Sequence, residues 1–185
     1  NASNLLVWGQ GDDAIDIDQA YAGTIDGAMV ILTDASDHGF EVDGPEGSAP
    51  GSFTLKNVTV IGATKACSAL GVNGEMADFR KAATGSLSNI LFKDFSGGKD
   101  VELDASADAA SYTAGTLTFA NIDIMHPVSE GAVCSSVETL NQIFDDKSDE
   151  STFEADASTF AEVVTAQKAG NGVDSSIFSW TFYAR

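Results

Sequence analysis

The chain has 185 residues, and its 28 Asp and Glu residues outnumber its 9 Lys and Arg residues, giving a net charge of −19. This excess of negative charge argues against binding to nucleic acid or to anionic membrane surfaces, because both partners need basic patches. We expect no membrane-spanning helix, since the sequence lacks an apolar run of the roughly 18 residues that one requires. The length fits one domain.

A repeat begins near the N-terminus and recurs along the chain. An Asn, once replaced by Gly, is followed by an apolar residue, any residue and a second apolar residue. The pattern starts at Asn4, Gly27, Asn57, Asn89 and Asn121, so the spacings are 23, 30, 32 and 32 residues. Such a period is typical of a solenoid, in which each repeat buries its apolar face only against its neighbours.

Two further short segments follow within each repeat. The first covers residues 14–18, 39–43, 69–73 and 100–104, and the second covers residues 23–25, 53–55, 86–87 and 116–117. Within the segments, apolar and polar residues alternate with the period of two that a half-buried strand requires. We therefore predict an all-β fold, a right-handed parallel β-helix with three short strands per coil and about four or five coils over residues 1–128.

The two ends of the chain differ. Residues 129–185 are predicted to form a small C-terminal cap with two short helices, which follow capping-box patterns at residues 135–138 and 159–162, and a final aromatic strand at residues 178–182. The first coil starts at Asn4 with no cap before it, which would expose an apolar cross-section and open strand edges. We expect this end to stack on upstream coils of the same protein or on another copy of the chain.

Acidic residues occupy the outward positions of the second segment. One column reads Asp16, Glu41, Gly71 and Glu102, and the next reads Asp18, Asp43, Asn73 and Asp104. Equivalent residues of adjacent coils would lie about 4.8 Å apart, where two like charges repel by roughly 3–4 kcal/mol at an effective dielectric constant near 20. Either the carboxylates point apart into water, with Lys99 or another base nearby, or they bind Ca²⁺, whose ligands are oxygens. The candidate ligands are Asp12, Asp13, Asp16, Asp18, Glu41 and Asp43, with Asp37 beside them.

Several other residues allow two interpretations each. His38 could act as an acid or base, or it could be a turn histidine bonded to a neighbouring carboxylate. Trp8 and Tyr21 could form a platform that stacks against sugars, or Trp8 could pack in the core or between coils. Cys67 and Cys134 fit no zinc or redox spacing, and they could form one disulfide or remain two thiols.

Several stretches of the chain are similar to known families. Residues 11–26, 36–47 and 178–181 resemble a family of uncharacterised secreted or surface β-helix lipoproteins of bacteria, which implies an extracellular parallel β-helix but no activity. Gly-Asp-Asp at residues 11–13 and Asp-His-Gly at residues 37–39 also look like turns of the polygalacturonase family. That likeness implies inverting glycoside hydrolysis by Asp12, Asp13 and His38. The Asn-Thr-Asp turn of that family would lie before Asn1, and its Arg-Ile-Lys motif has no match here.

These observations predict a non-catalytic extracellular module with a structural, adhesive or assembly role, whose partners are other protein chains. The alternative is a β-helix that binds or degrades a glycan. The two differ in the surroundings of Asp12, Asp13 and His38, which would line a cleft in an enzyme and a flat wall in a structural module.

Overall fold

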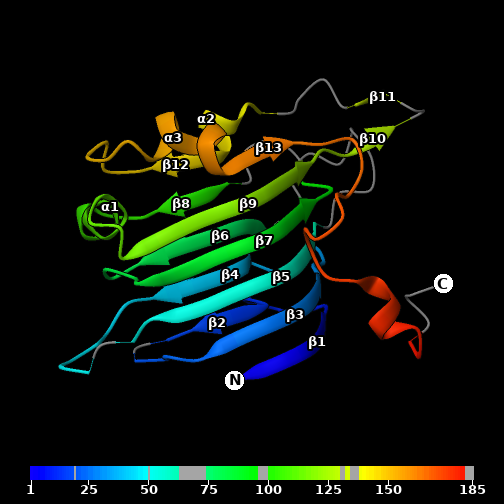
Figure 1. Ribbon diagram of the computed structural model, residues 1–185, viewed down its shortest axis with the longest axis horizontal. Coiled ribbons are helices and arrows are strands. Elements are labelled where there is room, and N and C mark those ends of the chain that lie inside the picture. Colours follow the sequence, from blue (N-terminus) through cyan, green and yellow to red (C-terminus); the bar gives the residue numbers. More distant parts are fainter. Residues whose placement is uncertain are drawn as a thin grey trace.

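The computed structural model describes residues 1–18, 20–49, 51–62, 74–95, 100–129, 132–133 and 138–181. Two parallel β-sheets face each other across the core (Figure 1). The six-stranded sheet contains, in spatial order, β1 (Ala2–Trp8), β3 (Thr24–Ile31), β5 (Phe53–Ile61), β7 (Gly85–Lys93), β9 (Leu117–Met125) and β13 (Ala161–Val163). The five-stranded sheet contains β2 (Ile15–Ile17), β4 (His38–Asp43), β6 (Glu75–Arg80), β8 (Val101–Leu103) and β12 (Phe144–Asp146). Because the chain alternates between the sheets, each coil stacks on the one before, and the predicted all-β parallel β-helix is confirmed.

Each long strand of the six-stranded sheet bends at one residue. The prediction of three short strands per coil is corrected here, because the third segment of one repeat and the first of the next form one continuous strand. The bend falls on the repeat residue itself, which has a positive φ of 57° at Asn57, 55° at Asn89 and 53° at Asn121, and of 83° at Gly27. Asn and Gly are the residues that adopt this left-handed conformation most readily, so the repeat marks a bend within a strand.

The asparagines at the bends form a ladder of side-chain hydrogen bonds. Asn121 Nδ2 donates to Asn89 Oδ1 at 3.2 Å, and Asn89 Nδ2 donates to Asn57 Oδ1 at 3.0 Å. Gly27 occupies this position in the preceding coil and has no side-chain amide, so Asn57 Nδ2 donates instead to Asp26 Oδ1 at 2.6 Å. The ladder therefore joins three coils and ends on a carboxylate.

The core lies between the two sheets and consists of the inward positions that the repeat predicts. In the six-stranded sheet these are Ala28, Val58, Ile90 and Ile122, followed by Val30, Val60, Phe92 and Ile124, all buried and in register. The five-stranded sheet contributes Phe40, Phe79 and Phe144. Phe40 lies against Phe92 with ring centroids 5.6 Å apart, so the sheets meet through aromatic contacts.

One strand lies at a different place from the one predicted. The segment that pairs with both β4 and β8 is β6, Glu75–Arg80, in which Ala77 and Phe79 point inward. Residues 69–73, where the sequence predicted this strand, lie outside the described residues, as do Cys67 and Cys134. Both segments alternate polar and apolar residues, so periodicity alone does not distinguish them. The outward place expected for Gly71 is taken by Asp78.

The C-terminal part also differs from the prediction. Both sheets continue beyond residue 128, since β12 pairs with β8 and β13 pairs with β9. Helix α3 (Phe153–Phe160) ends where a helix was expected to begin, and residues 161–163 form β13 because Ala161 faces the core. Helix α2 (Leu140–Ile143) follows Thr139, whose N–H donates to Gln142 Oε1 at 3.0 Å. Most of the expected capping box at 135–138 lies outside the described residues.

The predicted aromatic strand at residues 178–182 is wrong. Residues Ser175–Phe178 form a 3₁₀ helix, η1, because the Asp174 side chain accepts a hydrogen bond from the Ser176 N–H at 2.9 Å. Trp180 is 78 % exposed. Helix α1 (Ser106–Thr113) was not expected, and Asp108 anchors it by accepting a hydrogen bond from the Ala83 N–H at 3.1 Å. A short hairpin, β10 (Val128–Ser129) and β11 (Ala132–Val133), follows β9.

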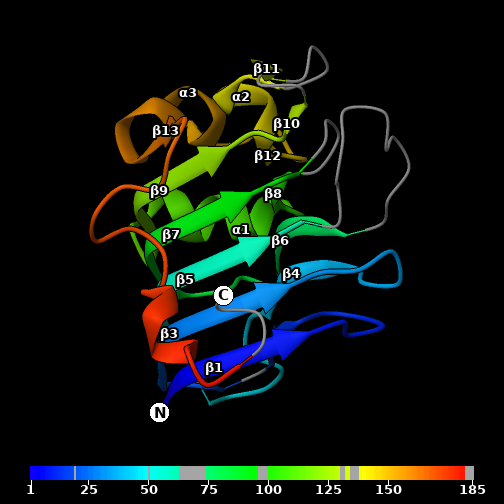
Figure 2. The ribbon, with the colours of Figure 1, turned by 90° about the vertical axis from the view of Figure 1, so that its right-hand side faces the viewer.

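Residues 164–181 form a strap that runs from β13 back across the outer side of the six-stranded sheet to β1 and β3 (Figures 1 and 2). Gly172 N–H donates to the Asn89 carbonyl at 2.9 Å, and Val173 N–H donates to Thr59 Oγ1 at 3.0 Å. Val173 and Phe178 pack with Met29 and Ile31 in a small second core. The strap thereby ties the last coil to the first.

The ladder yields the first prediction. We expect Asn89→Val to lower the free energy of unfolding by about 3 kcal/mol, because it removes two hydrogen bonds and forces a β-branched residue into the left-handed region. Asn89→Gly keeps the backbone conformation and should cost about 1–2 kcal/mol. Urea unfolding followed by circular dichroism measures both. Equal losses for Val and Gly would show that the bend does not constrain this position.

Candidate functional site

A row of carboxylates runs up the outer wall of the five-stranded sheet. Strand pairing places Asp16, Glu41, Asp78, Glu102 and Asp145 in register, one from each strand. The sequence predicted three of these, Asp16, Glu41 and Glu102. Neighbouring strands are about 4.8 Å apart, so this acidic row requires positive charge or protons to offset repulsion between its members.

Arg80 offsets the charge of the middle of the acidic row. Its guanidinium contacts the carboxylate of Glu41, and its Nε lies 2.8 Å from Asp43 Oδ1 and 3.8 Å from Asp78 Oδ2. Lys81 adds a second cation, with Nζ 2.6 Å from both Asp43 Oδ2 and Glu46 Oε1. The hydrogen bonds that Lys81 donates to these two carboxylates raise the pKa of Lys81.

Lys147 offsets negative charge at the far end of the acidic row. Its Nζ lies 2.5 Å from Asp145 Oδ2, 3.3 Å from Glu102 Oε2 and 3.5 Å from Asp100 Oδ2. The base that the sequence suggested, Lys99, lies outside the described residues. Arg80 and Lys147 both reach carboxylates on more than one strand, so they join coils while they balance charge.

Asp78 is the member of the acidic row whose pKa is raised most. Its Oδ1 is buried without a hydrogen-bond partner among the described residues. Burial, opposed by His38 and reinforced by the charges of Asp104 and Glu102, raises the pKa of Asp78 to about 7. A carboxyl group with this pKa exchanges its proton near neutral pH.

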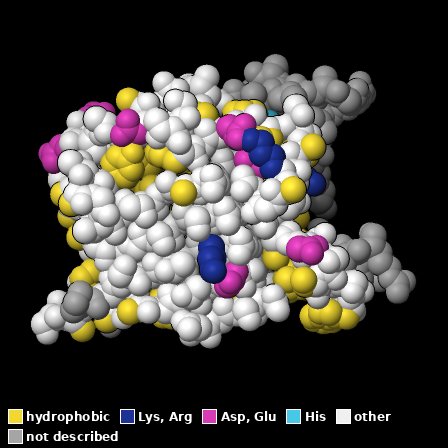
Figure 3. All heavy atoms as spheres, viewed as in Figure 1, with side chains coloured by type: hydrophobic (Ala, Val, Ile, Leu, Met, Phe, Trp, Pro, Cys, Tyr) yellow, Lys and Arg dark blue, Asp and Glu magenta, His cyan; other side chains and the backbone are white. Residues whose placement is uncertain are grey.

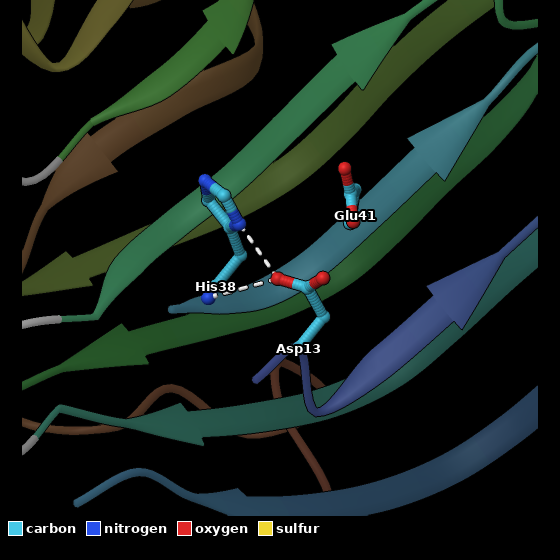
Figure 4. Close-up of side chains that lie close together, drawn as sticks. All are labelled: Asp13, His38 and Glu41. Atoms are coloured by element: carbon cyan, nitrogen blue, oxygen red, sulfur yellow. Dashed lines mark hydrogen bonds and ion pairs between the residues drawn. The ribbon is translucent and has the colours of Figure 1, made fainter. Parts of the chain in front are cut away.

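Asp13 and His38 form a close pair at the first two coils (Figure 4). Asp13 precedes β2 and His38 begins β4, so stacking of the strands brings them together. His38 Nδ1 lies 2.6 Å from Asp13 Oδ1, which also accepts a hydrogen bond from the His38 backbone N–H at 3.1 Å. Only 8 % of the Asp13 side chain and 14 % of the His38 side chain are exposed. Glu41 lies beside them on β4.

The candidate calcium ligands do not form one cluster, and the two groups that they do form share Asp13. Oxygen atoms of Asp12, Asp13 and Asp37 lie within 4.8 Å of one another, and Asp13 and His38 form a second such group with Glu41. Asp43 is occupied by Arg80 and Lys81. Asp16 and Asp18 are exposed residues, and partial desolvation of the Asp16 carboxyl group, followed by repulsion from Asp18, raises the pKa of Asp16. Asp12, Asp13 and Asp37 are therefore the carboxylates best placed to share a cation.

The same distances bear on glycoside hydrolysis. Inverting glycosidases generally hold their two carboxyl groups about 6.5–9.5 Å apart, which leaves room for the attacking water. Here carboxylate oxygens of Asp12, Asp13 and Asp37 lie within 4.8 Å of one another, and the Asp13 side chain is nearly buried. This spacing suits a shared cation or proton better than a sugar between the carboxylates.

The two residues suggested as a sugar-stacking platform, Trp8 and Tyr21, have different surroundings. Trp8 is 60 % exposed, so it is not a core residue, and packing between coils and a sugar-stacking platform stay predictions. Tyr21 packs against the main core. Among the described residues, none of the helices is long and apolar enough to cross a membrane.

The two facing parallel sheets, wound coil upon coil, define a parallel β-helix protein. The chain belongs to the family described as the pectate-lyase like beta helix domain, whose family model matches residues 1–182. Neither a curated protein nor a solved structure matches the chain.

Sequence reasoning missed Asp78, Arg80 and Lys147. The signal was present in the alternation of Ala77, Asp78, Phe79 and Arg80, which fits a half-buried strand with two charged outward positions. Lys147 gave no comparable signal, because it follows β12 in a segment where no strand was predicted.

Asp78 leads to a prediction about pH. Because its pKa is higher in the folded state than in the unfolded chain, the folded protein binds the extra proton between about pH 4 and pH 7 and loses stability as the pH rises through this range. We expect Asp78→Asn to raise the melting temperature at pH 8 and to flatten this part of the stability profile.

Asp26→Asn is the matched control. The hydrogen bond from Asn57 lowers the pKa of Asp26, so this change should lower the melting temperature at pH 8. Thermal unfolding from pH 4 to pH 8 measures both variants, and a steeper fall for Asp78→Asn than for the wild type would contradict the assignment.

Proposed function

We propose that the chain is a non-catalytic extracellular structural module, in which the edge of β1 receives a further coil from the same protein or from another copy. The observation that carries this proposal is the incomplete burial of the first coil. Leu5 and Val7 of β1 are partly buried, whereas their register partners in β3, Ala28 and Val30, are 0 % exposed. A further coil on β1 would complete the burial of these two side chains and pair the strand edge.

The charges of the five-stranded sheet support a structural role. Arg80 and Lys147 link carboxylates of neighbouring strands, and the Asp13–His38 pair joins the first two coils while remaining mostly buried. These groups hold coils together, and because their charged atoms already contact one another, few of these atoms are accessible to a substrate. A catalytic acid or base needs to be reachable by substrate, directly or through one water.

The opposite end of the solenoid is covered by a helix, so we propose that further coils stack only on the β1 end. Helix α3 places Phe153 among Tyr112, Phe119 and Phe144, with ring centroids between 5.0 and 5.7 Å apart. Phe153 is fully buried and Ala157 nearly so. Within the predicted cap of residues 129–185, we take helices α2 and α3 as the part that covers the last of about five right-handed coils, because a capped end resists further stacking.

An acidic surface suits a medium rich in cations, and this favours an extracellular location for the module. Ca²⁺ is the cation proposed for Asp12, Asp13 and Asp37, since it accepts several carboxylate oxygens in flexible geometry. The second candidate function is action on a glycan by Asp12, Asp13 and His38. The exposed carboxylate of Asp37, whose Oδ2 lies 3.9 Å from His38 Nδ1, favours this alternative.

The β1 edge yields a prediction of assembly. We expect the molecular mass measured by light scattering to rise with concentration above that of one 19.1 kDa chain. Leu5→Lys should abolish the rise, because it places a charge in the partly buried cross-section of the first coil. Val163→Lys, on the edge strand at the opposite end, is the matched control and should leave the rise intact. A monomer at every concentration would contradict assembly of copies through β1 and would favour the glycan alternative.

The cation proposal has its own test. Addition of EGTA to protein kept in Ca²⁺ should lower the melting temperature, because the acidic oxygens of Asp12, Asp13 and Asp37 would then repel one another. Asp37→Asn should remove most of this response. A melting temperature that does not respond to EGTA would rule out a stabilising Ca²⁺ site at these residues.

A further inference from the structure

A second candidate site lies on the six-stranded sheet, away from the acidic row. It is a groove of about 700 Å³. One wall is the end of helix α3, residues 158–160, followed by the start of β13, and the other wall is the strap at residues 168–171. Asn89 and Asn121, the last two asparagines of the ladder, line it from below. The volume falls within the range of about 300–1,000 Å³ that small-molecule sites occupy.

The ladder gives this groove a strong hydrogen-bond acceptor. Every amide in the ladder donates toward Asp26, in the order Asn121 to Asn89, Asn89 to Asn57, and Asn57 to the Asp26 carboxylate. Lys56 holds the other oxygen of that carboxylate at 3.0 Å. Hydrogen bonds aligned in a chain polarise one another, so electron density is drawn toward the last acceptor, Asn121 Oδ1.

The ladder stops at Asn121 because the next coil has no asparagine. Pairing of Ala161 with Ile122 puts Phe160 beside Asn121, where an amide would be needed to continue the ladder. Among the described residues, none donates to Asn121 Oδ1, and the Asn121 residue is exposed. A polarised acceptor therefore faces the groove, ready for a donor from a ligand.

The remaining lining groups make the groove a polar site. Ser158 and Thr159 present exposed hydroxyls, and the last turn of α3 leaves backbone carbonyls without helical partners. Lys168 of the strap pairs with Glu162 of β13, so the charges beside the groove compensate each other. Ile122 and Ala161 are buried and the Phe160 ring packs against Phe144 and Phe153, so little apolar surface is open to the groove.

We propose that this groove binds one or two units of an uncharged saccharide. Sugar hydroxyls donate to Asn121 Oδ1 and to the carbonyls at the end of α3, beside the exposed hydroxyls of Ser158 and Thr159. The net charge of −19 disfavours sugar acids. The site goes beyond the structural role of the module and is independent of the β1 edge, so each can fail without the other.

Binding of cellobiose and N,N′-diacetylchitobiose to the full chain tests the proposal, with digalacturonic acid as the charged probe. Saturation-transfer NMR and titration of backbone amide shifts report binding and place it. We expect at least one neutral disaccharide to bind with millimolar affinity or better and to shift amides of residues 158–162 and 168–171, while digalacturonic acid binds more weakly. Absence of binding by both neutral probes, or shifts confined to the acidic row, would overturn the proposal.

Two glycine variants separate a role in binding from a role in folding. Asn121→Gly and Asn57→Gly both keep the positive φ, as Gly27 does at the same place in its coil, and each removes one amide from the ladder. We expect Asn121→Gly to weaken binding about tenfold, which corresponds to one hydrogen bond of about 1.4 kcal/mol, and Asn57→Gly to weaken it about twofold or less. Equal losses would overturn the role of Asn121. Ser158→Trp should fill the groove and abolish binding, and full binding by this variant would place the ligand elsewhere.

Discussion

Parallel, in-register stacking is the constraint that governs every row of side chains in this structure. When every coil lies directly on the one before, each side chain meets its own equivalent about 4.8 Å away. Apolar residues then form continuous rows such as Val30, Val60, Phe92 and Ile124, and amides form a ladder. The same rule places carboxylate on carboxylate in the acidic row, where it is unfavourable. Rows of apolar residues and of amides stabilise the stack, whereas a row of carboxylates needs charge compensation.

The acidic row illustrates how an unfavourable stack is tolerated. Arg80 and Lys147 each reach several carboxylates, and Asp78, which remains between them, holds a proton up to about neutral pH because it is buried. Charge on this wall is therefore partly offset within the wall. The six-stranded sheet presents another kind of surface, since the face in Figure 3 shows few and scattered charged side chains. The two walls thus offer separate chemistry, one acidic and partly compensated, the other mostly uncharged and polar.

The repeat made most of the solenoid predictable, because period and alternation are direct consequences of stacking. It identified most of the inward columns and the pair Asp16–Glu41, and it placed Asp13 and His38 on adjacent coils without pairing them. It could not show that Asn57 or Asn89 bends a continuous strand, since a left-handed residue leaves the alternation on either side unchanged. Nor could it find β6 or the strap. The position of β6 depends on which of two similar segments pairs, and the strap is held by tertiary contacts such as Val173 N–H to Thr59 Oγ1.

Hydrogen–deuterium exchange at rising protein concentration shows whether β1 is an edge that receives another coil. Inner strands such as β5 and β7 are paired on both sides and should exchange slowly at every concentration. The amides of β1 should exchange quickly in dilute protein and become protected as the concentration rises. Exchange of β1 that stays fast while the mass increases would contradict this role of the edge and place the contact on another surface.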